Sequence, residues 1–193
     1  MSVRRRVLLG GGIGSGKSTA TGILAALGAE VMSADRAGHR VLAPGGAAAR
    51  RVAARWPEVV REGIIDRAAL GQVVFSDPVD LADLEAITHP AIRAEIEARI
   101  AACDAPVIVV ESPLPIELLG PGWCWVVIDA PDEVRIERLL RRGMDRVEIR
   151  RRIAAQPSRQ EWLDRADEVI ANHGDLGSLE AECRRVWGLL AGG

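Results

Sequence analysis

The sequence is short of cysteine, of long apolar runs and of excess basic charge, and each shortage narrows the choice of protein class. Its three cysteines (Cys103, Cys124 and Cys183) are scattered and form no C-x-x-C pair. Their scatter argues against a disulfide framework or a zinc site and fits a reduced cytoplasm. No apolar run approaches the ~18–20 residues that span a bilayer. The net charge of −2 disfavours a nucleic-acid-binding protein. Residues 4–6 are arginines that run into glycines, so no secretory signal is predicted.

Lysine is scarce in an unusual way, because Lys17 is the one lysine among 25 basic residues. A chain that uses arginine at every other basic position is expected to need a compact ammonium here, which the planar fork of arginine cannot replace. Drift in composition is the alternative explanation. The same scarcity excludes an N-K-x-D guanine box, so a GTPase switch protein is not predicted.

Length and apolar content predict a substantial core, and the alternation of strand and helix patterns predicts an α/β fold. The chain has 193 residues, 48% of them hydrophobic, which excludes disorder. Short apolar runs at residues 7–9, 29–32, 106–110, 123–128 and 168–171 predict buried parallel strands. Helical patterns at 17–27, 131–142, 145–155 and 176–190 alternate with them. This alternation predicts a five-stranded parallel sheet covered on both faces, a three-layer fold.

Residues 36–104 have a different texture, rich in alanine, arginine and glutamate and interrupted by prolines. We predict several short helices there, the clearest at 91–102, and no strand. The whole chain, residues 1–193, is therefore expected to be a single kinase-like domain. Residues 36–104 would form a helical acceptor-binding insertion, and residues 136–158 a helical lid.

Residues 11–18 match the phosphate-loop pattern G-x-x-x-x-G-K-[ST], between an apolar strand and a helix. Glycines let successive N–H groups turn toward an anion, and the helix adds its positive N-terminal end. In such a loop the lysine reaches the β- and γ-phosphates and the next hydroxyl ligates Mg²⁺. We therefore predict ATP and Mg²⁺, with Ser18 on the metal; an accidental glycine-rich turn is the alternative. The predicted ATP-binding residues are Gly12, Ile13, Gly14, Ser15, Gly16, Lys17, Ser18 and Thr19.

A small-molecule kinase fits this loop best, since an ATPase motor usually needs a longer chain. Arginines crowd a helical hairpin around Gly143 and Met144. A solvated basic face is the usual explanation for such a run. A kinase lid, whose arginines neutralise the transferring phosphoryl group, is the interpretation we favour. Arg138 and Arg142 are predicted to be catalytic together with Lys17, because residues i and i+4 share a helix face.

Two carboxylates stand where predicted strands end, which is the edge where doubly wound sheets bind ligands. Asp35 is predicted to orient and deprotonate an acceptor hydroxyl, to cap a helix that begins at Arg36, or to do both. Glu111 is predicted to belong to the Mg²⁺ shell. His39 and His89 lack companions at metal-ligand spacing, so structural or substrate-contact roles are expected for them.

The order of these motifs resembles the dephospho-CoA kinase family, which has a P-loop fold of the nucleoside-monophosphate-kinase type. The resemblance runs over nearly the whole length of the chain. Its most specific segments are L-E-A-I-T-H-P at 84–90 and A-D-E-V-I-A-N at 166–172. Other matching segments are 11–19, 34–39, 66–70, 113–114, 138–142 and 152–156.

The resemblance implies that ATP phosphorylates the ribose 3′-hydroxyl of dephospho-CoA, the last step of coenzyme A synthesis. It implies a cytoplasmic enzyme with no nucleic-acid, membrane or obligate protein partner. It makes Asp35 the proposed base and adds Asn172 to the ATP-binding residues. The implied acceptor contacts are Asp35, His39, His89, Pro113 and Leu114.

Five positions depart from the family pattern. Gly10 replaces a common threonine, Ser33 replaces an aspartate, Arg135 replaces a common glutamine, and Pro115-Ile116 replaces Leu-Phe. Two rival interpretations stay open: a kinase for another acceptor, such as a nucleoside monophosphate, and a non-catalytic nucleotide-binding regulator. A panel of acceptors assayed with ATP would distinguish all three.

Overall fold

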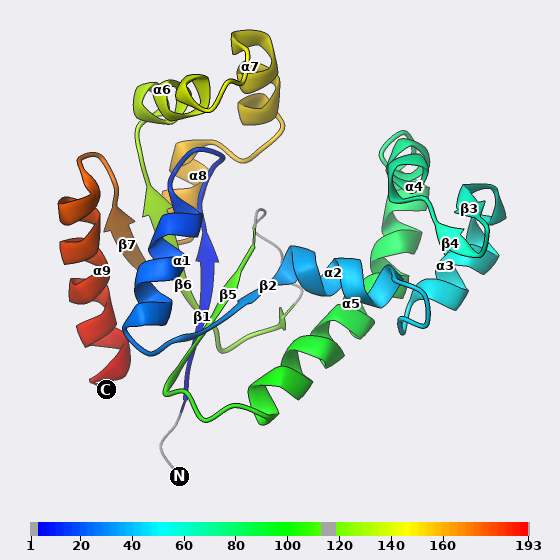
Figure 1. Cartoon of the computed structure of the whole chain (residues 1–193), viewed down its shortest axis with the longest axis horizontal. Coiled ribbons are helices and arrows are strands. Elements are labelled where there is room, and N and C mark those ends of the chain that lie inside the picture. The colour runs from blue at the N-terminus through cyan, green and yellow to red at the C-terminus, as the bar shows by residue number, and fades with distance from the viewer. Residues whose placement is uncertain (1–3, 113–118, 193) are drawn as a thin grey trace. The chain divides into compact units, whose positions relative to one another are not determined.

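The chain forms two compact units in the computed structural model, which describes residues 4–112 and 119–192. One unit takes its described residues from 1–33 and 103–193, and the other is Ala34–Ala102. The first unit contains the sheet and the phosphate loop, and the second is mostly helical (Figure 1).

The first unit is built on a parallel sheet of five strands in the order β2-β5-β1-β6-β7 (Figure 1). These strands are β1 (Arg5–Gly10), β2 (Glu30–Ser33), β5 (Val107–Glu111), β6 (Cys124–Asp129) and β7 (Glu168–Ala171). Leu9 of β1 is paired with Glu111 of β5 on one side and with Val126 of β6 on the other. The carboxyl ends of the central strands therefore meet at one edge, and the predicted five-stranded parallel sheet is confirmed.

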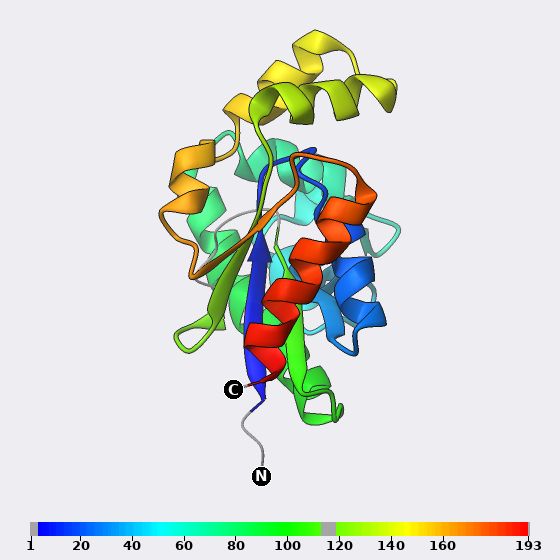
Figure 2. The same cartoon turned by 90° about the vertical axis from the view of Figure 1, so that its left-hand side faces the viewer.

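Helices cover both faces of this sheet. The helices of the unit are α1 (Lys17–Ala26), α6 (Asp132–Arg141), α7 (Arg146–Ala154), α8 (Arg159–Leu163) and α9 (Leu176–Ala191). Helices α1 and α9 lie side by side (Figure 2). Leu24 and Val186 pack with Val7 and Leu9 in the core. Leu8 points the other way and is buried too, since successive strand residues face opposite sides. The prediction of a three-layer fold is therefore confirmed.

The second unit, Ala34–Ala102, is more regular than the sequence predicts. Its elements are α2 (Ala34–Leu42), α3 (Ala49–Arg55), a 3₁₀ turn (Pro57–Val59), β3 (Val60–Arg61), β4 (Ile64–Ile65), α4 (Arg67–Val74) and α5 (Pro78–Ala101). The prediction of short helices is wrong for α5, which has 24 residues. It begins where Asp77 caps the Val79 amide, and it continues through Pro90.

The prediction that this stretch contains no strand is also wrong. Strands β3 and β4 form a small antiparallel hairpin. Its two turn residues, Glu62 and Gly63, both have positive φ, at 50° and 79°. A two-residue hairpin loop of this kind usually shows itself by Asn-Gly or Asp-Gly, so the Glu-Gly pair gave a weak signal.

No helix among residues 4–112 and 119–192 combines the length and the apolar character that crossing a membrane requires.

Candidate active site

The phosphate loop joins β1 to α1, and its glycines have conformations that other residues avoid. Gly14 and Gly16 have φ values of 81° and 102°. A side chain at Gly14 would place Cβ 2.9 Å from the Arg135 carbonyl oxygen, and one at Gly16 would place it 2.1 Å from Nδ2 of Asn172. Gly16 is the N-cap of α1, and no side chain caps the helix there. The positive end of α1 is therefore left open toward the loop.

Lys17 holds its ammonium group against the loop itself. Its Nζ donates hydrogen bonds to the carbonyl oxygens of Gly11, at 2.7 Å, and Gly12, at 3.4 Å. Burial lowers the pKa of Lys17, the carboxylate of Glu111 opposes this shift, and the charge of Arg135 adds to it. The ammonium thus lies in a partly dry place beside the loop, where its interaction with an anion is stronger than in water.

A cavity of about 300 Å³ opens over the loop. Its walls bring together residues that the sequence predicted separately, from the loop, the end of β5 and the end of α6, and also Gln156, to which the sequence assigned no role. They are Ile13, Gly14, Gly16, Lys17, Ser18, Thr19, Glu111, Arg142 and Gln156. The cavity therefore combines an anion-binding loop with two hydroxyl side chains, one carboxylate and one arginine.

Ser18 and Glu111 fit a divalent cation by chemistry, because Mg²⁺ prefers oxygen ligands and keeps several from water and phosphate. Both side chains line the cavity over the loop. Within the described ranges no three His, Cys, Asp or Glu side chains gather as a metal cluster. Ser18 and Glu111 could therefore complete a Mg²⁺ site in which phosphate oxygens supply most of the ligands.

Arg138 and Asn172 support the loop from behind. Nδ2 of Asn172 donates to the carbonyl oxygen of Ser15 at 2.7 Å, and Asn172 is 5% exposed. Arg138 donates to Oδ1 of Asn172 at 3.0 Å and to the Ser15 carbonyl at 3.4 Å. Burial lowers the pKa of Arg138, and the positive charges of Arg142 and Arg141 lower it further. Arg138 thus contacts the base of the loop, whereas Arg142 lines the cavity above it.

Asp35 and His39 form a pair in the second unit. Their side chains lie 3.3 Å apart, one turn of α2 from each other, and Arg67 contacts the same ring nitrogen of His39. Helix α2 begins at Ala34, so Asp35 is its second residue. The alternative that Asp35 caps a helix starting at Arg36 is therefore wrong, because the helix starts two residues earlier.

The remaining predicted acceptor contacts divide between described and undescribed parts of the chain. His89 is half-buried on α5, which packs against α2. Pro113 and Leu114 lie outside the described residues.

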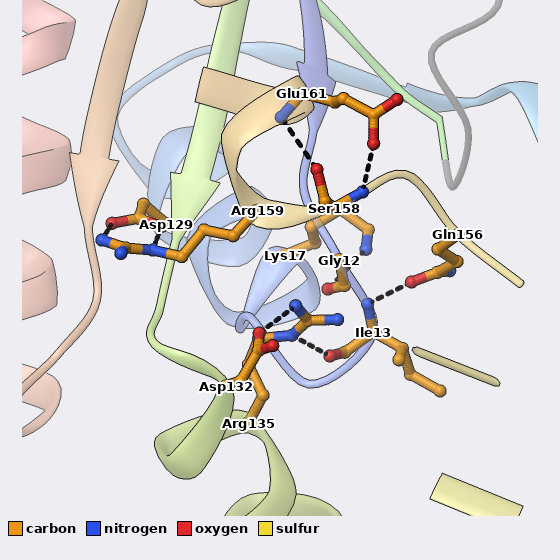
Figure 3. Close-up of polar contacts among 10 residues, drawn as sticks. All are labelled: Gly12, Ile13, Lys17, Asp129, Asp132, Arg135, Gln156, Ser158, Arg159 and Glu161. Carbon is orange, nitrogen blue, oxygen red and sulfur yellow. Dashed lines mark hydrogen bonds and ion pairs between the residues drawn. The ribbon is translucent and has the colours of Figure 1, made fainter. Parts of the chain in front are cut away.

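Asp129, the last residue of β6, centres an ion-pair cluster that the sequence patterns did not single out. It is 6% exposed and receives hydrogen bonds from Nε and an Nη of Arg159, both at 2.7 Å (Figure 3). His173 lies 3.0 Å from the same carboxylate. Arg159, and then His173, lower the pKa of Asp129. The rule that selected Asp35 and Glu111, a carboxylate at the end of a parallel strand, could have found Asp129.

Arg135 and Gln156 also contact the loop without having been assigned a role from the sequence. Both reach the backbone of Ile13, one from each side (Figure 3). The signals in the sequence are the departure of Arg135 from the family pattern and the place of Gln156 in a matching segment.

Comparisons with known proteins identify the family of the chain. A family model described as dephospho-CoA kinase matches residues 5–178. A dephospho-CoA kinase of Aromatoleum aromaticum is 43% identical over 184 residues, which cover 92% of this chain and 90% of that protein. Among solved structures, the TT1252 protein of Thermus thermophilus has a TM-score of 0.83 at 33% identity, covering 97% of this chain and 99% of the other.

The dephospho-CoA kinase from Campylobacter jejuni superposes with a TM-score of 0.71 at 27% identity, over 98% of this chain and 99% of that chain. A family model that spans most of the residues, and a relative of this identity over nearly the full length, show that the chain belongs to the dephospho-CoA kinase family.

Proposed function

We propose that this chain transfers the terminal phosphoryl group of ATP to the ribose 3′-hydroxyl of dephospho-CoA, which yields coenzyme A. The observation that carries the proposal is the cavity in which the phosphate loop, Lys17, Glu111 and Arg142 meet. Such transfers depend on positioning and on charge stabilisation more than on covalent chemistry, and this cavity supplies both.

The loop binds the phosphates of ATP through its backbone amides and the open end of α1. Lys17 moves its ammonium from the carbonyls of Gly11 and Gly12 to the β- and γ-phosphates. Asn172 and Arg138 act on ATP through the loop, because both hold the Ser15 carbonyl from behind. Their contribution is to keep the amides aimed at the nucleotide.

Mg²⁺ would be held by the Ser18 hydroxyl and, directly or through water, by Glu111. When bound it supplies charge neutralisation on the phosphate oxygens. The two side chains give it one neutral and one anionic oxygen, which leaves room for the phosphates in its shell.

Asp35 is the proposed base that accepts the proton of the 3′-hydroxyl. His39 keeps the carboxylate of Asp35 in place, since the two side chains are 3.3 Å apart. We assign the acceptor to the insertion at 36–104, with further contacts from His89, Pro113 and Leu114.

The lid at 136–158 places Arg142 over the transferring phosphoryl group, and this is supported by the position of Arg142 in the cavity wall. The enzyme works in the cytoplasm, without a nucleic-acid, membrane or obligate protein partner. Three free cysteines and a net charge of −2 support this assignment.

An acceptor panel tests the function. The purified chain is assayed with ATP and Mg²⁺ against dephospho-CoA, AMP, CMP and shikimate. We expect turnover of dephospho-CoA and negligible turnover of the other three acceptors. A comparable rate with any of them would favour another small-molecule kinase, and ATP binding without transfer would favour a regulator.

A further inference from the structure

One residue of the phosphate loop, Ile13, is held on both sides by side chains that are distant in sequence. The backbone N–H of Ile13 donates to Oε1 of Gln156 at 2.7 Å, and the carbonyl oxygen of Ile13 accepts from Nε of Arg135 at 2.8 Å (Figure 3). Ile13 therefore has both of its backbone polar groups engaged by side chains. Its conformation depends on residues 143 and 122 positions away along the chain.

The two holding residues stand at the two ends of the proposed lid. Arg135 immediately precedes residue 136, and Gln156 lies two residues before residue 158. Arg142, between them in sequence, lines the same cavity as Gln156 and Ile13. Any change in how Gln156 contacts Ile13 therefore changes how the far end of the lid is attached to the loop.

The contact between Arg135 and Ile13 is rigid. Arg135 is 3% exposed, and its guanidinium also donates to Oδ1 of Asp132 at 2.7 Å. Its backbone leaves no room for a side chain at Gly14. Helix α6 thus forms a fixed wall against the loop.

Gln156 contacts Ile13 through a single side-chain hydrogen bond and lies on the short connection between α7 and α8. The backbone amide of Gln156 donates to the carbonyl oxygen of Ile153 at 3.1 Å. Two residues later Ser158 and Glu161 form a capping box that fixes the start of α8 (Figure 3). The connection is fixed on both sides of Gln156. The side chain of Gln156 therefore loses little conformational entropy when it bonds to Ile13.

We infer that Gln156 is a positioning residue for phosphoryl transfer: by accepting the Ile13 N–H, it fastens the C-terminal end of the lid to the phosphate loop. Phosphate oxygens only accept hydrogen bonds, so an amide already bonded to Gln156 is not among those offered to ATP. Gln156 therefore acts on the loop and the lid, and through them on Arg142. This inference rests on the proposed function for the identity of the reaction but not for the contact itself.

The contact is tested by amide hydrogen exchange on the nucleotide-free protein. We expect the Ile13 amide to be protected in the wild type and to exchange about fivefold faster in Gln156→Met, which keeps the length and loses the acceptor. Gln156→Glu keeps an acceptor oxygen and should retain the protection. Gln160→Met is the matched control, because Gln160 is exposed and its side chain bonds, within the described residues, only to Asp164, the residue that caps the C-terminus of the same helix.

Steady-state kinetics test the positioning role. We expect Gln156→Met to lower kcat for dephospho-CoA about tenfold, since misplaced groups reduce the rate of the chemical step, with the KM for ATP changed less than threefold. Gln160→Met should leave both parameters unchanged. A drop in kcat that is accompanied by loss of exchange protection throughout β1 would mark a structural role and overturn the inference.

Two other outcomes also overturn it. One is an unprotected Ile13 amide in the wild type, which needs no variant at all. The other is wild-type kcat in Gln156→Met despite faster exchange at Ile13. An inactive wild type with a protected Ile13 amide would instead contradict the proposed function and leave the contact standing.

Discussion

The ion-pair cluster on Asp129 makes a quantitative prediction about stability. Asp129→Asn removes a carboxylate that is 6% exposed and accepts two hydrogen bonds from Arg159 at 2.7 Å. Hydrogen bonds to charged groups contribute about 1.5–3 kcal/mol each. The side chain of Arg159 is 43% exposed, and solvent screens the pair on that side. We therefore expect the free energy of unfolding to fall by about 2 kcal/mol in total.

The same pair predicts a dependence on pH. Arg159 and His173 hold the pKa of Asp129 below its ordinary value of 3.8, so the folded state favours the ionised carboxylate. Its stabilisation is present in full well above that value and is lost as the pH falls through the lowered pKa. The difference in stability between wild type and Asp129→Asn should thus shrink as the pH falls below about pH 4.

Thermal unfolding measured between pH 3 and pH 7 is the assay. At neutral pH a loss of about 2 kcal/mol corresponds to a drop in Tm of about 4–8 °C for a chain of this size. Asp104→Asn is the control, because Asp104 is fully exposed and pairs loosely with Arg4 at 3.4 Å. An unchanged Tm in Asp129→Asn, or a difference that grows at low pH, would refute the reasoning.

Three further variants test the site. Lys17→Arg should lower kcat nearly as much as Lys17→Ala, by about 10²–10³, because the guanidinium is too broad for the place of the ammonium; near-normal turnover would make the lone lysine a compositional accident. Arg142→Ala should lower kcat more than it raises the KM for dephospho-CoA, whereas Arg141→Ala, on an exposed pair with Glu137, should change neither. Asp35→Asn should keep the Tm and the affinity for ATP while lowering kcat by about 10²–10⁴; normal turnover would move the search for a base elsewhere.

The sheet could be predicted from sequence because each of its strands is a short apolar run, and runs of this kind are buried on both faces. The insertion was harder to predict for local reasons. Pro90 lies inside α5 and suggests a break that packing against α2 and α4 overrides. The hairpin turn uses Glu62 with a φ of 50°, the one non-glycine residue with positive φ in the described ranges.

The phosphate loop could be recognised because its pattern lies in a few adjacent residues, and Glu111 could be placed near it because both follow strands of one parallel sheet. The contacts of Gln156 and Arg135 with Ile13 could not be predicted, since they join segments more than 120 residues apart. No local pattern encodes such a distance. The Asp129 cluster is intermediate: its position at a strand end is visible, but Arg159 and His173 come together with it only in the folded chain.

The lone lysine gives the protein a property useful for chemical labelling. Amine-directed reagents react with the unprotonated side chain, and burial lowers the pKa of Lys17 so that this form is more abundant at a given pH. With 24 arginines and a single lysine, the chain offers one ε-amino group, and that group lines the cavity over the phosphate loop. An acylating reagent small enough to enter would therefore mark this cavity alone among side-chain amines, and occupancy of the cavity could be followed by protection of that one residue.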